Sequence, residues 1–412
     1  MFRRGLFYSY LSIYLRFFLE LSVTETTLFA SLPMIFNVLF QNFVWGNISD
    51  KYQLRRTLII IGEITAAVIT IAVWYIHTLT DNNVTAGYII IIGLSVVEIF
   101  WSMSNVGWSA LLSDLYPAEE RAGIQGKLQS FGSLGRFAGV FIGGLLYDGV
   151  PYMYPGWGFH EGALFMIASG VMAISTIPVF FLPEGGFAVG KSETSAESLR
   201  ELVTGSGSRF GISRKFGIFL IAMTFIYFGM NSVSLLKSQY LTLDDGFDVS
   251  SGLLSYILNT ATIAVFIVGL TVRKMSLKFK DEYLLLAGTV ITMVYLLGYV
   301  FAQELILIFA SDFLFGTSFA IIVASSYAYA SRLIPPEKRG KQFALFNATM
   351  FLSWGVPGTF ITGPLVDFLI HSGLGDVFSY RMAFLAAAVM VLIGSCILIV
   401  TIRNGKKEKP TA

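Results

Sequence analysis

Hydrophobic residues follow one another along this chain in long runs that short polar segments separate. The runs lie near residues 5–19, 27–46, 57–77, 87–113, 126–150, 161–182, 216–238, 251–272, 284–302, 305–331, 342–370 and 381–402. A transmembrane helix needs about 20 apolar residues, whereas a membrane β-strand alternates its polarity over about 10. These runs do not alternate, so the pattern predicts an all-α integral membrane protein with twelve transmembrane helices.

The composition agrees with this prediction and excludes disulfide bonds and cysteine-based metal sites. Of the 412 residues, 55% are hydrophobic and 13% are charged, about half the charge of a soluble domain. The single cysteine, Cys396, excludes a disulfide framework and a cysteine metal cluster. The histidines, His77, His160 and His371, lie at the ends of apolar runs. We therefore expect no metal and no cofactor.

The basic residues predict the orientation of the chain. If the N-terminus is cytoplasmic, all but four of the 28 Lys and Arg residues lie in cytoplasmic loops or tails, the four being Arg16, Arg136, Lys237 and Arg381. This asymmetry is the positive-inside pattern. It places both termini in the cytoplasm, and we expect a multi-pass protein of the plasma membrane.

The chain divides into two halves of six predicted spans. We expect an N-terminal bundle over residues 1–182, a central cytoplasmic loop over 183–215, a C-terminal bundle over 216–403 and a tail over 404–412. Within the loop, Ser195–Val203 has the composition of a short surface helix.

The two halves resemble each other in sequence. The segment Leu115–Arg121 (LYPAEER) matches Leu333–Arg339 (LIPPEKR), and the glycine-rich runs before Asp148 and Asp367 also match. Duplicated six-helix halves around a central site are a transporter architecture. The same alignment places the start of the seventh span before Met1. The first span is therefore either a short, tilted helix or the remainder of one that begins upstream.

The loop between the second and third spans carries a specific motif. GNISDKYQLRR, from Gly46 to Arg56, is similar to G-x-x-x-D-[RK]-x-G-[RK]-[RK], the signature of the major facilitator superfamily, with the second glycine lost and one residue inserted. Asp114–Arg121 resembles the family's D-x-x-P-x-x-x-R stretch. The fifth span resembles the glycine-rich antiporter motif, with Val140 where proline is expected. The family's R-x-x-x-G motif is absent.

The resemblance implies two bundles that rock to give alternating access. It also implies that charged loop residues close the cytoplasmic side in the outward-facing state, and the gating set would be Gly46, Asp50, Lys51, Arg55, Arg56, Asp114 and Arg121. Ion pairs of this kind are made in one state and broken in the other. Alternatively, the basic residues only set the topology and bind lipid headgroups.

A polar stripe runs along the fourth span. Its members recur at helical spacing: Ser95, Glu98, Ser102, Asn105, Ser109 and Ser113. A charge at mid-membrane costs about 2.5–3.5 kcal/mol, so it faces a cavity or a partner. Arg136, on the fifth span, lies at a depth similar to that of Glu98. We therefore expect a Glu98–Arg136 pair, either responsive to protons or substrate or serving as a static bridge.

Other charged residues in the spans allow more than one interpretation. Glu63 is expected to be structural, and Asp312 to face either the cavity or a packed interface. Arg16 and Lys237 are expected to reach the membrane interface, or to attract anions to the outer mouth. Asp148 and Asp367 would lie at helix ends.

The family architecture suggests further residues for the cavity and for helix packing. The cavity candidates include Tyr14, Asn105, Asn231 and Tyr327. The packing candidates are small residues that permit close helix contact: Gly135, Gly139, Gly143, Gly144, Gly358 and Gly363.

These features favour a secondary transporter of a small organic solute, coupled to protons, with efflux preferred to uptake. Proton- or cation-coupled uptake of a sugar or another nutrient is the alternative, and a non-transporting receptor or scaffold is the candidate of another class. No P-loop, nucleic-acid-binding surface or acid–base cluster of an enzyme is present in the sequence. We expect a monomer whose partners are substrate, protons and lipids. The four deepest ionisable residues are three acids, Glu63, Glu98 and Asp312, and one base, Arg136. This excess of acids suits proton coupling or a cationic substrate.

Overall fold

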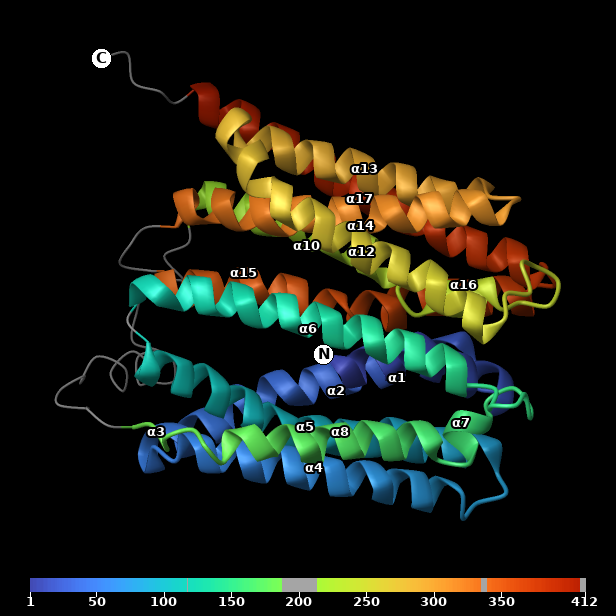
Figure 1. Ribbon diagram of the computed structural model, residues 1–412. Coiled ribbons are helices and arrows are strands. Elements are labelled where there is room, and N and C mark those ends of the chain that lie inside the picture. The colour runs from blue at the N-terminus through green and yellow to red at the C-terminus, as the bar shows by residue number, and fades with distance from the viewer. Residues whose placement is uncertain (117, 187–212, 335–338, 408–412) are drawn as a thin grey trace.

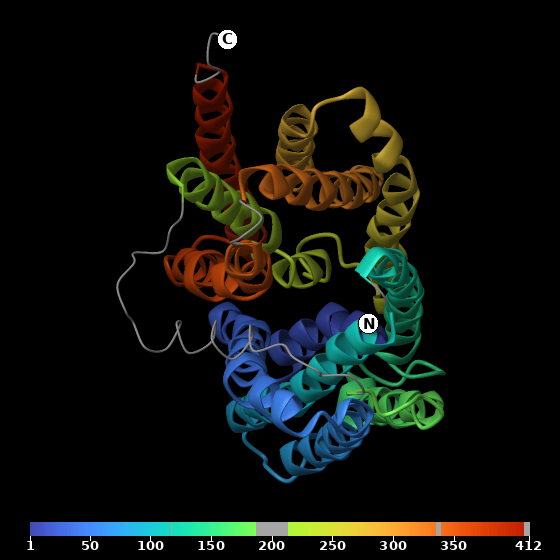
Figure 2. The same ribbon diagram turned by 90° about the vertical axis from the view of Figure 1, so that its left-hand side faces the viewer.

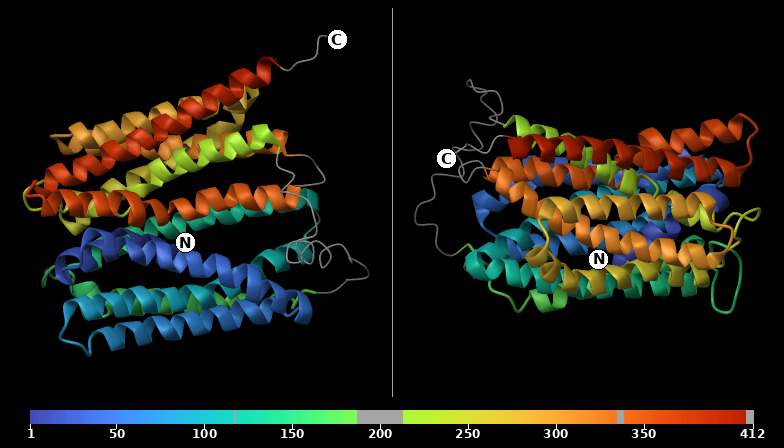
Figure 3. Two further views of the ribbon diagram at one scale, coloured as in Figure 1. Left: turned by 180° about the vertical axis from the view of Figure 1, so that it is seen from behind. Right: turned by 90° about the horizontal axis from the view of Figure 1, so that it is seen from above.

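The computed structural model describes residues 1–116, 118–186, 213–334 and 339–407. In these ranges the chain forms two helical bundles whose long helices run along a common direction (Figures 1 and 3). Viewed along the helices, the N-terminal bundle lies below the C-terminal one (Figure 2). Twelve spans can be traced through the described residues, which confirms the predicted all-α fold of two six-helix bundles.

The N-terminal bundle is built from residues 2–179. Its helices are α1 (Phe2–Ile13), π-helical η1 (Tyr14–Phe18), α2 (Val23–Phe40), π-helical η2 (Gln41–Trp45), α3 (Gly46–Tyr52), α4 (Arg55–His77), α5 (Asn83–Leu115), α6 (Ala118–Leu146), α7 (Trp157–His160) and α8 (Ala163–Val179). Local signals explain several of the starts. Ser22 and Glu25 form a capping box at α2, and Asn82 accepts the Thr85 amide at the start of α5.

The C-terminal bundle is built from residues 214–407. Its helices are α10 (Arg214–Ser232), α11 (Leu236–Leu241), α12 (Ser251–Lys278), α13 (Asp281–Phe301), α14 (Leu305–Leu333), α15 (Arg339–Ser353), π-helical η4 (Gly358–Thr362), α16 (Gly363–His371) and α17 (Asp376–Lys407). Ser213 and Ser250 cap α10 and α12 in the same way as Asn82 caps α5.

Eight helices among the described residues are long and apolar enough to cross a membrane, and Phe131–Leu146 and Ala163–Val179 are shorter apolar helices. Two predicted spans differ from continuous helices. The span predicted at 216–238 breaks after Ser232 and resumes as α11, and the span predicted at 342–370 is divided into α15, η4 and α16. Glycine and proline at 355, 357 and 358 account for the second interruption. The surface helix expected at Ser195–Val203 lies outside the described residues.

The two bundles meet at one end of the molecule, formed by the N-termini of α2 and α12 and the C-termini of α6 and α16. We call it the sealed end. Asp367 of α16 accepts hydrogen bonds from the Val23 and Thr24 amides of α2 at 2.8 and 2.7 Å. On the other flank, Ser251 of α12 donates to Asp148 Oδ2 at 2.6 Å. Each matched aspartate therefore binds the first turn of a helix in the opposite bundle.

Deeper contacts continue this seam toward the middle of the membrane. Thr27 and Ser31 of α2 bond the Thr359 hydroxyl at 2.9 Å, and Gln239 of α11 donates to the Ser12 carbonyl at 3.1 Å. At the opposite, basic end the described ion pairs stay within one bundle. Hydrogen bonds between described residues thus join the bundles only in the half that leads to the sealed end.

Candidate functional site

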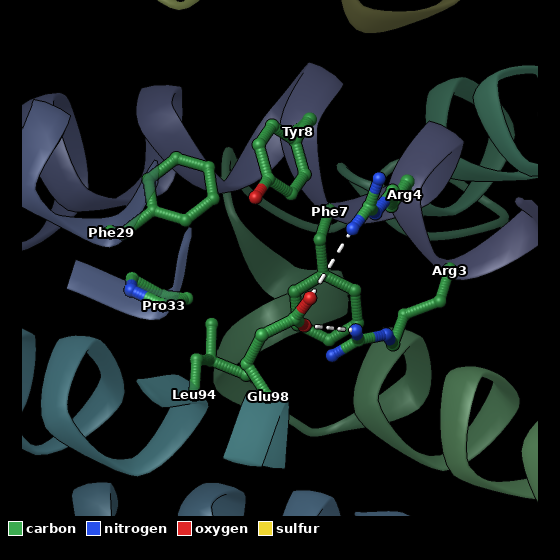
Figure 4. A pocket seen from close by; sticks show the side chains of 8 residues that line it. All are labelled: Arg3, Arg4, Phe7, Tyr8, Phe29, Pro33, Leu94 and Glu98. Atoms are coloured by element: carbon green, nitrogen blue, oxygen red, sulfur yellow. Dashed lines mark hydrogen bonds and ion pairs between the residues drawn. The ribbon is translucent and has the colours of Figure 1, made fainter. Parts of the chain in front are cut away.

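The carboxylate of Glu98 lies at the middle of α5 and is almost completely enclosed, with 3% of the residue exposed. It accepts hydrogen bonds from Arg3 Nη2 at 2.6 Å, Arg4 Nη2 at 3.2 Å and Asn37 Nδ2 at 3.0 Å (Figure 4). A buried carboxylate is expensive unless charged hydrogen bonds compensate it. Both guanidinium groups also lie over the Trp101 ring, 5.4 and 4.8 Å from its centre.

The expected Glu98–Arg136 pair is not formed, and its place is taken by pairs with Arg3 and Arg4. The reason is that α1 packs directly on α6. A Cβ on Gly5 would lie 2.4 Å from the Arg136 carbonyl, so the two backbones are in close contact. The arginines of α1 therefore reach Glu98.

Sequence reasoning missed Arg3 and Arg4 because it counted them with the cytoplasmic basic residues. A signal for their depth was present in the repeat alignment, which extends the first span to include both residues. That register puts the two arginines inside the membrane rather than before it.

A second buried ion pair lies in the C-terminal bundle. Lys237, the second residue of α11, is 6% exposed and donates to Asp312 Oδ1 on α14, which is fully buried. Tyr299 of α13 donates to the other carboxylate oxygen at 2.6 Å. The Lys237 ammonium also lies 5.0 Å from the centre of the Phe315 ring. Lys237 therefore does not reach the membrane interface as expected, because the break after α10 directs it onto α14.

A cavity lies between these two ion pairs and is lined by both bundles. Its walls are Tyr8, Ser9, Arg136, Val140, Ser234, Leu235, Lys237, Ser238, Leu258, Ala261, Tyr295, Phe315 and Trp354. Tyr8 also lines the neighbouring hollow beside Glu98, which Phe7, Phe29, Pro33 and Leu94 complete (Figure 4). Arg136 is exposed although it lies far from either end of α6, since its side chain faces this cavity.

The remaining cavity candidates lie elsewhere. Tyr14 is fully buried and hydrogen-bonds His77 at 3.2 Å inside the N-terminal bundle. Asn105 lines a separate cavity with Glu63, which accepts from the Ser104 hydroxyl at 2.8 Å. These positions face neighbouring helices of their own bundle.

Two candidates in the C-terminal bundle also lie away from the cavity walls. Asn231 donates to the Ser353 hydroxyl at 2.7 Å. Tyr327 is 55% exposed and stacks on Phe343. Neither residue is among those that line the central cavity.

The gating set lies at the basic end. Arg55 donates from Nε to Asp114 Oδ2 at 3.3 Å and also bonds Ser49, whereas Arg56 pairs with Glu184 at 3.1 Å. These contacts tie α3, α4 and α5 into one unit. Gly46 begins α3, and the exposed Lys51 lies over the Tyr52 ring. The side chains of Asp50 and Arg121 lie outside the described residues.

Four of the predicted packing glycines lie where helices approach closely. A Cβ on Gly139 would lie 2.2 Å from the Phe2 carbonyl oxygen, and one on Gly143 would meet the Tyr10 ring at 2.6 Å. The other two close approaches join the bundles: Gly144 faces α12, and Gly363 faces the start of α2. Gly135 and Gly358 have only ordinary van der Waals neighbours.

No group of three His, Cys, Asp or Glu able to hold a metal ion occurs in the part of the chain that the structure describes.

Comparisons with known proteins agree with this architecture. The family model described as Major Facilitator Superfamily matches residues 1–359. No curated protein matches the chain in sequence.

Solved structures share the fold at low identity. A mutant of the nucleoside transporter NupG superposes with a TM-score of 0.75 at 14% identity, covering 97% of this chain and 96% of that one. A bacterial homologue of the human lysosomal transporter Spinster, inward-facing and unoccupied, gives 0.74 at 14%, covering 100% and 96%. A D-xylose–proton symporter gives 0.65 at 15%, covering 95% of each chain.

Proposed function

Because this chain belongs to the Major Facilitator Superfamily, we propose that it is a proton-coupled secondary transporter of a small organic solute. The solute binds in the cavity between the bundles, and Asp312 carries the coupled proton. The observation that carries the proposal is the Lys237–Asp312 pair, whose lysine lines the cavity while its aspartate is fully buried.

Alternating access is supported by the distribution of contacts between the bundles. The described hydrogen bonds between them lie in the half nearer the sealed end, and the ion pairs Arg55–Asp114 and Arg332–Asp281 at the basic end stay within one bundle. With the basic end in the cytoplasm, this is the arrangement of an inward-facing transporter. Rocking about the cavity would break the seam at the sealed end and bring the basic ends together.

Proton coupling is supported by the mutual dependence of Lys237 and Asp312, each of which neutralises the other's charge. A fully buried carboxylate is costly without its cation, so Asp312 binds a proton when Lys237 moves to the substrate. Tyr299 can hydrogen-bond Asp312 in either form. Glu98 is less suited to this role, because two guanidinium groups and an amide hold its ionised form.

The direction of transport does not follow from the glycine-rich α6. Its glycines pack against α1 and α12, and such packing serves uptake and efflux equally. We propose that the protein works as a monomer in the cell membrane, because one chain supplies the whole cavity.

The test is transport by purified protein in vesicles that contain a pH-sensitive dye. Sugars, nucleosides, amino acids and organic acids are offered in turn, and both solute counterflow and proton movement are recorded. We expect at least one solute to be exchanged and to move protons. Asp312→Asn should retain counterflow but lose the proton movement, whereas Asp244→Asn, in an exposed turn at the sealed end, should retain both.

Two results would contradict the proposal. Unchanged proton movement in Asp312→Asn would remove Asp312 from the coupling. No exchange of any solute by correctly folded protein would favour the non-transporting receptor instead.

A further inference from the structure

We propose that the cavity selects an organic anion, whose acidic group binds Arg136 and Lys237 while its apolar or aromatic body lies against the cavity's rings. This inference rests on the proposed function and specifies its substrate class.

Arg136 presents a charged group to the cavity. Its side chain faces the cavity from mid-membrane. Among the described residues it has no hydrogen-bond or ion-pair partner, in contrast to Arg3, Arg4 and Lys237. A guanidinium group in such surroundings is costly without an anion, and its planar fork matches a carboxylate or phosphate.

Positive groups outnumber negative ones around the cavity. The basic groups are Arg3, Arg4, Arg136 and Lys237, and the acidic groups are Glu98 and Asp312. Positive charge remains in excess even when Glu63 of the adjoining cavity is included. The excess of acids counted from the sequence reverses here, because that count omitted the two arginines of α1 and placed Lys237 at the interface.

Aromatic rings and hydroxyl groups make up much of the cavity's walls. Tyr8, Tyr295, Phe315 and Trp354 supply rings from both bundles, and Ser9, Ser234 and Ser238 supply hydroxyl groups. Such a lining suits a flat or apolar body with a few polar substituents. Sugars, which need many hydrogen bonds, fit it less well.

Binding across the bundles would also couple the substrate to the conformational change. Arg136 belongs to α6 and Lys237 to α11, so one anion would hold the two bundles together. Because Lys237 is paired with Asp312, protonation of Asp312 frees the ammonium group for the anion. Binding of the proton then strengthens binding of the substrate, and binding of the substrate strengthens binding of the proton.

The experiment compares acids with their neutral counterparts by calorimetric titration of the detergent-purified full chain. The probe pairs are benzoate and benzamide, indole-3-acetate and indole-3-acetamide, and uridine monophosphate and uridine. In at least one pair we expect the acid to bind more tightly. Arg136→Gln should weaken the binding of that acid by about 10- to 100-fold, the range of one charged hydrogen bond. It should leave the affinity for the neutral member of the pair unchanged.

Two variants serve as controls. Lys278→Gln removes an equal charge from an exposed site at the end of α12 and should leave the affinities for both members of a pair unchanged. Arg136→Lys keeps the charge and should retain part of the affinity, which separates loss of the anion site from loss of folding.

The proposal is overturned if no acid in the panel binds, if neutral members bind as tightly as their acids, or if Arg136→Gln weakens both members of a pair equally. Counterflow distinguishes this failure from failure of the transport proposal. A neutral or cationic solute that is still exchanged would preserve the transporter and remove only the anion preference.

Discussion

The clasp between Asp367 and the start of α2 should control how often the sealed end opens. Asp367 accepts the Val23 and Thr24 amides at 2.8 and 2.7 Å, across the boundary between the bundles. A hydrogen bond to a charged group contributes about 1.5–3 kcal/mol when well buried. Asp367 is half-buried and the freed amides regain water, so we assign about 2 kcal/mol to both bonds together. Asp367→Ala should therefore raise the ratio of open to sealed molecules about 30-fold.

The measurement is the distance distribution between two spin labels on opposite bundles at the sealed end. Asp81→Cys and Asp245→Cys provide exposed sites, and Cys396→Ser removes the only native cysteine. We expect a new, longer distance to gain population in Asp367→Ala. The control is Asp376→Ala, which alters a carboxylate in the first turn of α17 at the same end of the molecule. An unchanged distribution in Asp367→Ala, or an equal change in the control, would refute the clasp.

Further predictions concern pH, a buried charge and helix packing. Burial raises the pKa of Asp148 at the sealed end. Asp148 therefore binds a proton more tightly when the end is sealed than when it is open. Lowering the pH from the raised pKa toward the ordinary pKa of an aspartate should increase the sealed population. Asp148→Asn should abolish this pH dependence of the distance between the spin labels. Glu98→Gln leaves two partly buried guanidinium groups without their counter-charge. It should lower stability by about 3 kcal/mol, seen as a lower melting temperature in detergent. Gly139→Ala forces α6 away from the Phe2 carbonyl and should lower the free energy of unfolding by about 1–3 kcal/mol in the same assay. Gly170→Ala, at a position with open space around it, should leave stability unchanged. Equal melting temperatures for the two alanine variants would contradict the close packing at Gly139.

Much of the architecture could be read from the sequence, because lipid imposes a length and a polarity on each span independently of its neighbours. The repeat of Leu115–Arg121 and the motif from Gly46 to Arg56 indicated two related bundles and their family. Arg55 and Asp114, which the motifs place in one gating set, form an ion pair between the start of α4 and the end of α5.

The site was less accessible to sequence reasoning. Glu98, Arg136 and Asp312 were recognised as deep charges, because any ionisable group in an apolar run stands out. Their partners were not recognised. Glu98 bonds Arg3 and Arg4, which the charge pattern assigned to the cytoplasmic N-terminus. Asp312 bonds Lys237, which the pattern assigned to the membrane interface.

The sequence alone therefore determined that the chain crosses the membrane, how many spans it has and that Glu98, Arg136 and Asp312 lie within spans, since these depend on local hydropathy and spacing. Only the tertiary structure decided which charges neutralise each other and which one faces the cavity alone. That choice depends on the rotation and depth of each helix, and these follow from close contacts such as Gly5 against Arg136 and from the break after Ser232. Such contacts join residues far apart in the chain, so the pattern within any one span does not contain them.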